Sequence, residues 1–337
     1  MSQNYVPPEV SSLLGLIDTH LRWKKQQEKH DREYFYYHPS EWGKCLRKQQ
    51  YKHFVQLGYI ESPPAEQIGG QKARLFDKGH NMHSRWQNWY FAEMGILRGR
   101  WKCLNPLCFT FDNEGKDRRD NLKEEHWKHI NEGQTRVFGV KEKLGCFRPE
   151  KCNCGHNKFT YCEVPVVSDE LKLKGNADII LDFSNFDPGK YKGVRKTFNE
   201  LVFPKKPIVV DMKTINDWSW KQQLLKVGAH KEYIVQVTIY AHLLDCEYGI
   251  LIYENKNDST AMAYKVERNN DLFGIVREQA KRMIVLSESK KLPPPKPEDQ
   301  SVRECQDCEF SSMCHKSKIW EDDKLDEKRR MFYKSLL

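Results

Sequence analysis

The sequence predicts an α/β protein in which a mixed sheet is flanked by helices. Short apolar runs rich in β-branched residues, typical of strands, occur at 161–167, 171–182, 208–214, 249–254 and 262–266. They alternate with longer helical stretches at 73–94, 217–246 and 270–290. The chain of 337 residues is long enough for one large domain or two small ones with a real core.

The composition is that of a soluble globular protein, with 39% hydrophobic and 31% charged residues. No run approaches the ~18 apolar residues of a membrane span, and the N-terminus lacks the apolar region of a signal peptide. We therefore expect an intracellular protein without membrane contact. The net charge of +9 allows an anionic partner without proving one.

Eleven cysteines are many for a reducing compartment, where disulfides are rare, so clustered cysteines indicate metal sites. Residues 99–162 read as an insertion, in which Cys pairs in Gly- and Pro-containing turns flank a very polar stretch. These pairs supply the four soft ligands of a tetrahedral structural zinc site. The ligands that we predict are Cys103, Cys108, Cys152 and Cys154. Cys146 or His156 could replace one of them, because C-x-C is tighter than the usual C-x2-C; reduced thiols without metal are the alternative.

Near the C-terminus, Cys305, Cys308 and Cys314 form a C-x2-C-x5-C motif. Three clustered thiolates need a fourth ligand from elsewhere, and Cys45 is available near the N-terminus. Four Cys thiolates suit a [4Fe–4S] cluster, which would tie the two ends of the chain together as a clasp. A second zinc site is the alternative, because the spacing alone does not separate the two metals.

The run 208–214 reads as a buried strand that ends in an acid, a spacer and a lysine. Alternate residues of a strand share a face, so Asp211 and Lys213 point the same way. The carboxylate can hold a divalent cation while the ammonium, ~7 Å along the same face, approaches the same phosphate. A solvated Asp/Lys pair at a strand end is the alternative.

Polar residues on neighbouring elements complete a candidate catalytic site. His83 on the first helical stretch and Asp178 on the preceding strand could join Asp211 in binding one or two Mg²⁺ or Mn²⁺ ions, with histidine favouring Mn²⁺ slightly. Such ions activate water and stabilise the charge of a pentacovalent phosphate. For His83, a surface position on a polar helix is the alternative.

Lys213 would position or deprotonate the water, or offset the developing negative charge. Gln236 and Tyr240 lie one turn apart on a helix and therefore share a face. From that face they could orient Lys213 or contact the DNA backbone.

Taken in order, these motifs resemble the RecB-like branch of the PD-(D/E)XK nucleases. The motifs are Ser40-x4-Cys45-x-Arg47-x3-Tyr51, Gly79-x3-His83, Gly175-x2-Asp178, Asp211-x-Lys213, Gln236-x3-Tyr240 and the terminal C-x2-C-x5-C. More narrowly, they are similar to the iron–sulfur exonucleases of the CRISPR-associated type and to the nuclease domain of AddB. The insertion is similar to the zinc-binding one of stand-alone phage members. The resemblance covers about residues 36–320 apart from the insertion.

This resemblance implies a restriction-endonuclease-like mixed central sheet flanked by helices, a small zinc-binding insertion and a structural iron–sulfur clasp. It implies a Mg²⁺- or Mn²⁺-dependent DNA exonuclease that acts on single-stranded ends in recombination, repair or replication, in the cytoplasm of a prokaryote or a phage-infected host. A helicase or recombinase could be its partner. The metal ligands would be His83, Asp178 and Asp211, with Lys213 catalytic. Gln236 and Tyr240 would belong to the Q-x3-Y helix of the family, and the cluster ligands would be Cys45, Cys305, Cys308 and Cys314.

We accordingly divide the chain into an N-terminal helical part (1–98), the insertion (99–162), the nuclease core (163–290) and the cluster segment with its tail (291–337). The core hairpin is longer than is usual in the family because of a loop at 184–207. Lysines and arginines of this loop could follow a phosphate backbone, although a solvated loop is an equal alternative. These residues are Lys190, Lys192, Arg195, Lys196, Lys205 and Lys206.

Two other functions remain open from the sequence. One is a catalytically weak iron–sulfur and zinc protein that binds DNA as an accessory of a recombination or replication complex. Retention of all four core residues argues against this reading. The other is a nuclease directed at RNA, since a site that reads the backbone need not exclude RNA.

Overall fold

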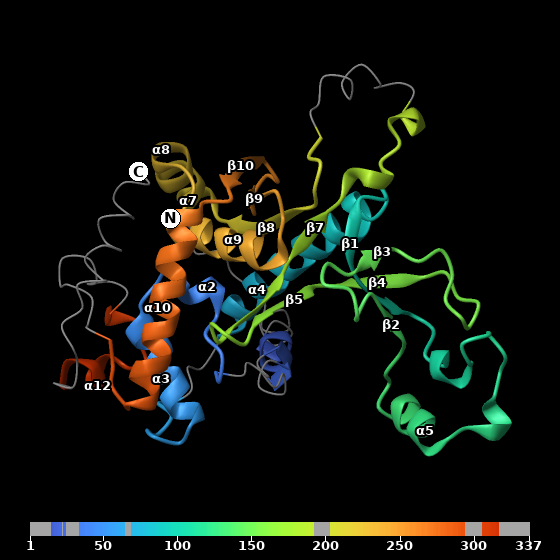
Figure 1. Ribbon diagram of the computed structural model, residues 1–337, viewed down its shortest axis with the longest axis horizontal. Helices are drawn as coiled ribbons and strands as arrows, with labels where there is room; N and C mark the ends of the chain where they lie inside the picture. Colours follow the sequence, from blue (N-terminus) through green and yellow to red (C-terminus); the bar gives the residue numbers. More distant parts are fainter. Residues whose placement is uncertain are drawn as a thin grey trace.

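The computed structural model describes residues 15–21, 23–24, 34–64, 69–191, 203–293 and 305–316. The chain forms a mixed α/β fold with a central, mostly antiparallel sheet flanked by helices (Figure 1), which confirms the predicted class at this level. Within the described residues, no helix is long and apolar enough to cross a membrane.

The main sheet has the strand order β10-β9-β8-β7-β1-β2, and β3 and β4 also pair with β1. Its strands are β1 (Leu97–Cys103), β2 (Val137–Phe138), β3 (Cys146–Phe147), β4 (Phe159–Cys162), β7 (Ile179–Leu181), β8 (Ile208–Ile215), β9 (Tyr248–Asn255) and β10 (Ala261–Glu267). The strands β5 (Val164–Ser168) and β6 (Leu173–Ala177) form a separate antiparallel pair. Strands β8 and β9 run parallel, which requires a crossover, and the helix α9 (Lys231–Leu244) provides it.

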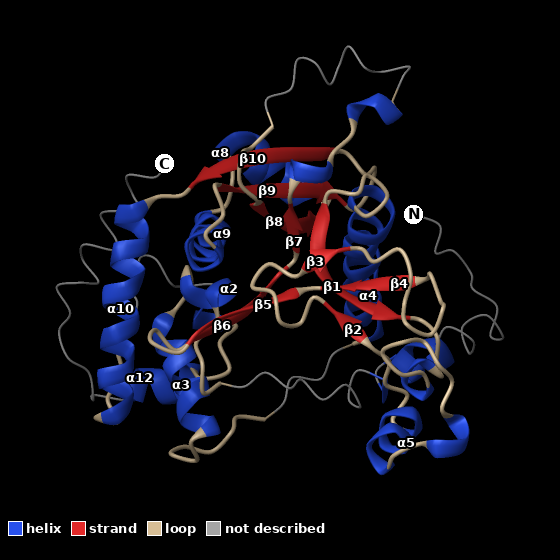
Figure 2. Cartoon of the chain, turned by 45° about the vertical axis from the view of Figure 1, so that its right-hand side comes forward, coloured by secondary structure: helices blue, strands red, loops and turns tan. Residues whose placement is uncertain are grey.

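Strand β8 is covered on both faces, which explains its continuous apolar run. Val209 packs in a core cluster with residues of α9, whereas Ile208 and Val210 pack in a second cluster with residues around Trp86. Figure 2 accordingly shows α9 and α4 on opposite sides of this part of the sheet. Gly249 lets α9 approach β9 closely, because a Cβ there would lie 2.0 Å from the side chain of Val237.

The remaining helices cover the sheet and its ends. They are α2 (Pro39–Trp42), α3 (Leu46–Gln56), α4 (Gly70–Arg85), α5 (Glu124–Asn131), α7 (Asp217–Ser219), α8 (Leu225–Val227), α10 (Asn270–Glu288) and α12 (Ser311–Lys316). Two π-helical turns continue α4 and α7 at Trp86–Phe91 and Trp220–Leu224. The stretch predicted as one helical region at 217–246 is broken at Gly228, whose φ of +87° ends α8 before α9 begins.

Two of the predicted strands are also broken, and both breaks lie beside the candidate site. The run 171–182 becomes β6 and β7, with Asp178 between them, and the run 161–167 becomes the end of β4 and β5, with Glu163 between them. At these two residues the chain passes from one sheet to the other. The side chain of a residue at such a bend does not have to follow the alternation of side chains along a strand.

Candidate functional site

The acid and the lysine of β8 contact each other, as the alternation of side chains along a strand predicts. Lys213 Nζ lies 2.7 Å from Asp211 Oδ2, and Asp211 is fully buried. The ring of Tyr233 on α9 lies under the ammonium, 4.6 Å from Nζ to the ring centroid. Sequence reasoning missed Tyr233, which stands three residues before Gln236 and therefore on the same helical face.

Gln236 joins these two charged groups from α9. Its Nε2 donates to Asp211 Oδ1 at 2.9 Å, and its Oε1 accepts from Lys213 Nζ at 3.3 Å. Tyr240, one turn later, is buried and hydrogen-bonds the Gln236 side chain. Its hydroxyl also lies against Gly175, where a Cβ would be only 2.5 Å away. Tyr240 therefore acts on the site through Gln236.

Asp178 lies at the bend between β6 and β7. The backbone N–H of Met212 donates to its Oδ2 at 3.1 Å, which holds the carboxylate against β8. His83 on α4 approaches the same oxygen, with Nδ1 at 3.7 Å. Gln87, one turn after His83, donates through Nε2 to the backbone oxygen of Asp178 at 2.9 Å. The structure thus brings together the six residues predicted for the catalytic site: His83, Asp178, Asp211, Lys213, Gln236 and Tyr240.

The pKa values of the site reflect burial and like charges. Burial, with the neighbouring Asp178 charge, raises the pKa of Asp211 to about 7, although Lys213 opposes the shift. Burial also raises the pKa of Asp178. Burial and the charge of Lys213 lower the pKa of His83 to about 4, so its imidazole is neutral at neutral pH. Burial opposes the charge on Lys213, but the Asp211 and Asp178 carboxylates raise its pKa above the usual range.

The residue types of this site are those that bind divalent cations, but among the described residues only the four thiols of the insertion bring three or more ligand atoms within 4.8 Å of one another. Carboxylates and a neutral imidazole are ligands for Mg²⁺ or Mn²⁺. Burial is the largest cause of the raised pKa values of Asp178 and Asp211. A cation held by Asp178, Asp211 and His83 would favour the charged form of both carboxyl groups.

A third acid with a shifted pKa, which sequence reasoning did not single out, stands close in the chain to this part of the sheet. Glu163 lies at the bend between β4 and β5, and the charges of Asp178 and Asp211 act on it. Burial, followed by these two charges, raises the pKa of Glu163 to about 7. The sequence offered no motif for it: it is a single acid in a run predicted as a continuous strand.

The insertion contains a preformed group of four thiols. One sulfur atom from each of Cys103, Cys108, Cys152 and Cys154 lies within 4.8 Å of the others, and the group could bind a metal ion. The Sγ atoms of Cys103 and Cys154 are 3.8 Å apart, and those of Cys108 and Cys152 are 3.4 Å apart. These are the four ligands predicted from the sequence. The alternatives Cys146 and His156 are not part of the group.

Two local turns bring these four sulfur atoms together. Cys103 ends β1, and Cys108 begins a short 3₁₀ helix five residues later. The second turn is closed by the backbone N–H of Cys152, which donates to the oxygen of His156 at 2.7 Å. Burial raises the pKa of Cys103 to about 11 and that of Cys108 further, so without a cation these thiols stay protonated. A bound metal ion would reverse this, because it stabilises thiolates.

The predicted cluster ligands also meet. Cys45 precedes α3, and it lines one cavity with the three C-terminal cysteines Cys305, Cys308 and Cys314. Beside this cavity the rings of Tyr51 and Phe310 stack with centroids 5.1 Å apart. Arg47 Nη1 donates to the backbone oxygen of Pro293 at 2.7 Å. The two ends of the described chain are therefore joined around the four cysteines.

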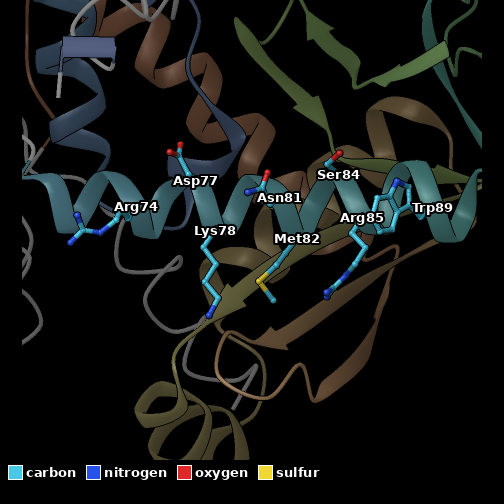
Figure 3. Close-up of a pocket in the computed structure, with 8 residues that line it drawn as sticks. All are labelled: Arg74, Asp77, Lys78, Asn81, Met82, Ser84, Arg85 and Trp89. Carbon is cyan, nitrogen blue, oxygen red and sulfur yellow. The ribbon is translucent and has the colours of Figure 1, made fainter. Parts of the chain in front are cut away.

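Residues of α4 and of the π-helical turn that follows it line an open groove of about 650 Å³ (Figure 3). Its residues are Arg74, Asp77, Lys78, Asn81, Met82, Ser84, Arg85 and Trp89. Trp89 is 63% exposed. Lys78 Nζ hydrogen-bonds the backbone oxygen of Lys256, and Arg85 pairs with the buried Glu254.

Only part of the loop at 184–207 can be described. The backbone N–H groups of Lys205 and Lys206 donate to the carboxylate of Glu247 at 2.8 and 2.9 Å, which fixes the start of β8. Lys190 ends a short 3₁₀ turn. The other basic residues named for this loop, Lys192, Arg195 and Lys196, lie outside the described residues.

Comparison with known proteins gives little. No protein-family model matches the chain, and no curated protein is similar to it. A solved structure described as "Crystal structure of SSO0001" shares 16% sequence identity over 92% of this chain and 98% of that chain, with a TM-score of 0.38. A similarity of this size supports no conclusion about the fold or the function of this chain.

Proposed function

We propose that this protein is a Mg²⁺- or Mn²⁺-dependent deoxyribonuclease with a restriction-endonuclease-like core, which hydrolyses phosphodiester bonds from single-stranded DNA ends during recombination, repair or replication. One observation carries the proposal. Lys213 Nζ contacts the buried Asp211 carboxylate at 2.7 Å, and Asp178 and His83 approach from two other elements. Cation ligands thus lie beside a charged lysine, as metal-assisted phosphodiester hydrolysis requires.

Each side chain has a role in this proposal. Asp178, Asp211 and the neutral imidazole of His83 hold the cation, which when bound polarises the phosphate and lowers the pKa of water. Lys213 is charged at neutral pH because its pKa is raised, so it offsets the negative charge that develops on the phosphate rather than accepting a proton. Gln236 holds Lys213 and Asp211 at their spacing.

The cysteines are structural in this proposal. The four thiols of the insertion bind Zn²⁺, because a closed set of four sulfur ligands is typical of structural zinc sites. Cys45 and the three C-terminal cysteines bind a [4Fe–4S] cluster. These four cysteines line one cavity, and they are not among the described groups whose ligand atoms all lie within 4.8 Å of one another, which favours a cluster over a single ion.

The groove on α4 supports a nucleic-acid partner. Lysine and arginine side chains with an exposed indole are the contacts that proteins make to phosphates and unpaired bases. The net charge of +9 agrees with an anionic partner.

The test is digestion of end-labelled single- and double-stranded DNA with Mg²⁺ or Mn²⁺, beside Lys213→Ala and the control Lys221→Ala. Lys221 is an exposed lysine that pairs with Asp217. We expect metal-dependent release of nucleotides by the wild type and by Lys221→Ala. Lys213→Ala should fold, bind DNA and lose about 10³-fold in rate or more. Full activity of Lys213→Ala, or DNA binding by the wild type without any cleavage, would refute the nuclease and leave a DNA-binding accessory protein.

A visible spectrum tests the cluster separately. An anaerobically purified [4Fe–4S] protein is brown and absorbs near ~400 nm. A colourless protein that contains two equivalents of zinc would place zinc at both cysteine sites. The nuclease proposal does not depend on this result.

A further inference from the structure

Two lysine side chains, Lys78 on α4 and Lys256 just after β9, hold these two elements together. Lys78 Nζ donates to the backbone oxygen of Lys256, and Lys256 Nζ donates to the backbone oxygen of Leu75 at 3.5 Å. The backbone N–H of Lys256 also donates to the oxygen of Ile215, which ends β8, at 2.8 Å. Both ammonium groups are therefore held at the end of the strand that carries Lys213.

The ammonium group of Lys256 lies over Gly79, on the face of α4 that carries His83. A Cβ at Gly79 would be 4.0 Å from Lys256 Nζ and 3.4 Å from Thr214 Oγ1. Gly79 and His83 are four residues apart on α4 and share one face of it. Thr214 directly follows Lys213 on β8. The Lys256 ammonium thus stands about one helical turn from the candidate centre.

The charges of this pair are incompletely balanced, because within the described residues the two ammonium groups donate to backbone oxygens and not to carboxylates. Two acids stand near Lys256 in the chain. Glu254 binds Arg85, and Asp258 accepts from the backbone N–H two residues later at 2.9 Å. Burial, followed by the charge of Lys78, lowers the pKa of Lys256. An anion that contacts both ammonium groups would offset this repulsion.

Lys78 also lines the open groove of about 650 Å³ beside α4. In Figure 3 the side chains of Lys78 and Arg85 point to one side of α4, whereas that of Asp77 points to the other. The exposed indole of Trp89 lines the same groove. A nucleic-acid strand with one phosphate between the two lysines can therefore continue along a groove that offers an indole for stacking of an unpaired base.

We propose that Lys78 and Lys256 form a binding site for one backbone phosphate of a DNA strand, beside the phosphate that is cleaved. This inference rests on the proposed function and deepens it, because it names side chains that would position the strand. Each ammonium group would donate to an oxygen of the same phosphate. A terminal phosphate offers the same oxygens, so the experiment uses strands with and without one.

Binding of single-stranded DNA at several salt concentrations tests the proposal without reference to activity. Fluorescence anisotropy is measured on the full-length protein without added Mg²⁺ or Mn²⁺. Each phosphate that a protein neutralises on a single strand contributes about 0.7 to the slope of log K against log salt concentration. Lys78→Met and Lys256→Met should each weaken binding and reduce this slope by about 0.7. Lys256→Arg, which keeps the charge, should recover the slope of the wild type.

The double variant tests whether both lysines hold the same phosphate. Its slope should fall by about 0.7 in total, whereas a fall of about 1.4 would mean two separate phosphates and would overturn the shared site. The matched control is Lys226→Met, which removes one charge from an exposed lysine that hydrogen-bonds Gln222. This control should keep the slope of the wild type. A fall in slope that occurs only on strands with a terminal phosphate would also overturn a backbone site.

The outcomes separate this inference from the function on which it rests. If the variants lose slope but the wild type cuts no DNA with Mn²⁺, the phosphate site stands and the nuclease fails. If the wild type cuts DNA and both single variants keep its slope, the phosphate site fails and the nuclease stands. A wild type that binds no single-stranded DNA would overturn both. Circular dichroism verifies folding, and if Lys256→Met unfolds, Lys78→Met decides, because Lys78 is exposed.

Discussion

The thiol group of the insertion and the carboxylate centre of the sheet are built in opposite ways. The thiols come from two short turns, and their four sulfur atoms already lie within 4.8 Å of one another. The carboxylates come from a bend and from β8, and they are held by the backbone of β8, by the π-helical turn after α4 and by α9. The first site depends on local structure, whereas the second depends on the whole fold.

In the proposed function, this difference separates a structural site from a reactive one. Four sulfur ligands complete a tetrahedron and leave no position for a substrate. The carboxylate centre instead has acids of raised pKa and a neutral imidazole, which retain the capacity to bind a cation and a phosphate. Changes at the two sites should therefore affect different measurements.

The largest effect should come from Asp178→Asn. The amide can still accept from the N–H of Met212, so the bend is preserved, but a charged cation ligand is lost. We expect cleavage to fall by about 10³-fold or more, with unchanged zinc content and DNA binding. Initial rates at saturating DNA measure this. Loss of zinc together with activity would mean that the two sites are not independent.

Cys108→Ser should give the converse result. It removes one thiol from the closed group, so bound zinc should fall by about one equivalent and the insertion should become sensitive to protease. Cleavage by the sheet-based centre should fall by less than about 10-fold. Metal analysis and limited proteolysis are compared with Cys162→Ser, a half-buried cysteine of β4 outside the group. If Cys108→Ser binds as much zinc as the wild type, the four thiols of the insertion are not the zinc site.

A smaller effect is expected from Gln236→Ala. Its side chain contacts the cation ligand Asp211 and also Lys213, so its loss should misplace the ammonium without removing any charge. We expect kcat to fall by about 10- to 100-fold with little change in KM, since positioning acts on the transition state. Gln222→Ala is the control, because Gln222 hydrogen-bonds the exposed Lys226. An equal rise in KM would indicate a role in binding DNA.

The sequence was sufficient where a local pattern, such as an apolar run or a pair of nearby cysteines, determines the structure. The apolar run of β8 predicted a buried strand with Asp211 and Lys213 on one face, because burial on both faces fixes that strand. The connection of Gln236 to this pair rested on the resemblance. The thiol group was found because its ligands form two pairs, and the members of each pair are close in sequence. These predictions needed no knowledge of long-range packing.

The remainder depends on tertiary structure that periodicity does not encode. The runs 161–167 and 171–182 read as continuous strands, but each bends where it changes sheets, at Glu163 and at Asp178. Gly175, Asn176 and Ala177 are residue types depleted in strands, so they give a weak signal for the bend at Asp178, whereas the single Glu163 gives little signal for the other bend. Glu163 was missed for this reason, because a single acid at a bend between β4 and β5 belongs to no sequence motif.

The smallest predicted effect is a pH dependence of cation-linked stability. Burial raises the pKa values of Asp211 and Glu163 to about 7 in the folded protein. Between about pH 4 and pH 7 the folded protein therefore keeps protons that the unfolded chain has released. The free energy of unfolding should fall as the pH rises through this range. His83 opposes this between about pH 4 and 6.5, because its pKa is lowered to about 4 and the unfolded chain binds the extra proton.

Two acids outweigh one histidine, so without Mn²⁺ the centre should destabilise the fold more at pH 8 than at pH 6. A bound cation requires deprotonated carboxylates and should therefore stabilise the protein more at the higher pH. We expect Mn²⁺ to raise Tm by at least about 2 °C more at pH 8 than at pH 6, which corresponds to about 1 kcal/mol. Thermal unfolding with and without Mn²⁺ measures this difference, and Asp178→Asn should reduce it. An equal rise in Tm at both pH values would mean that Mn²⁺ binds away from these carboxylates. The carboxylate centre would then not differ from the thiol group of the insertion in the way that its raised pKa values predict.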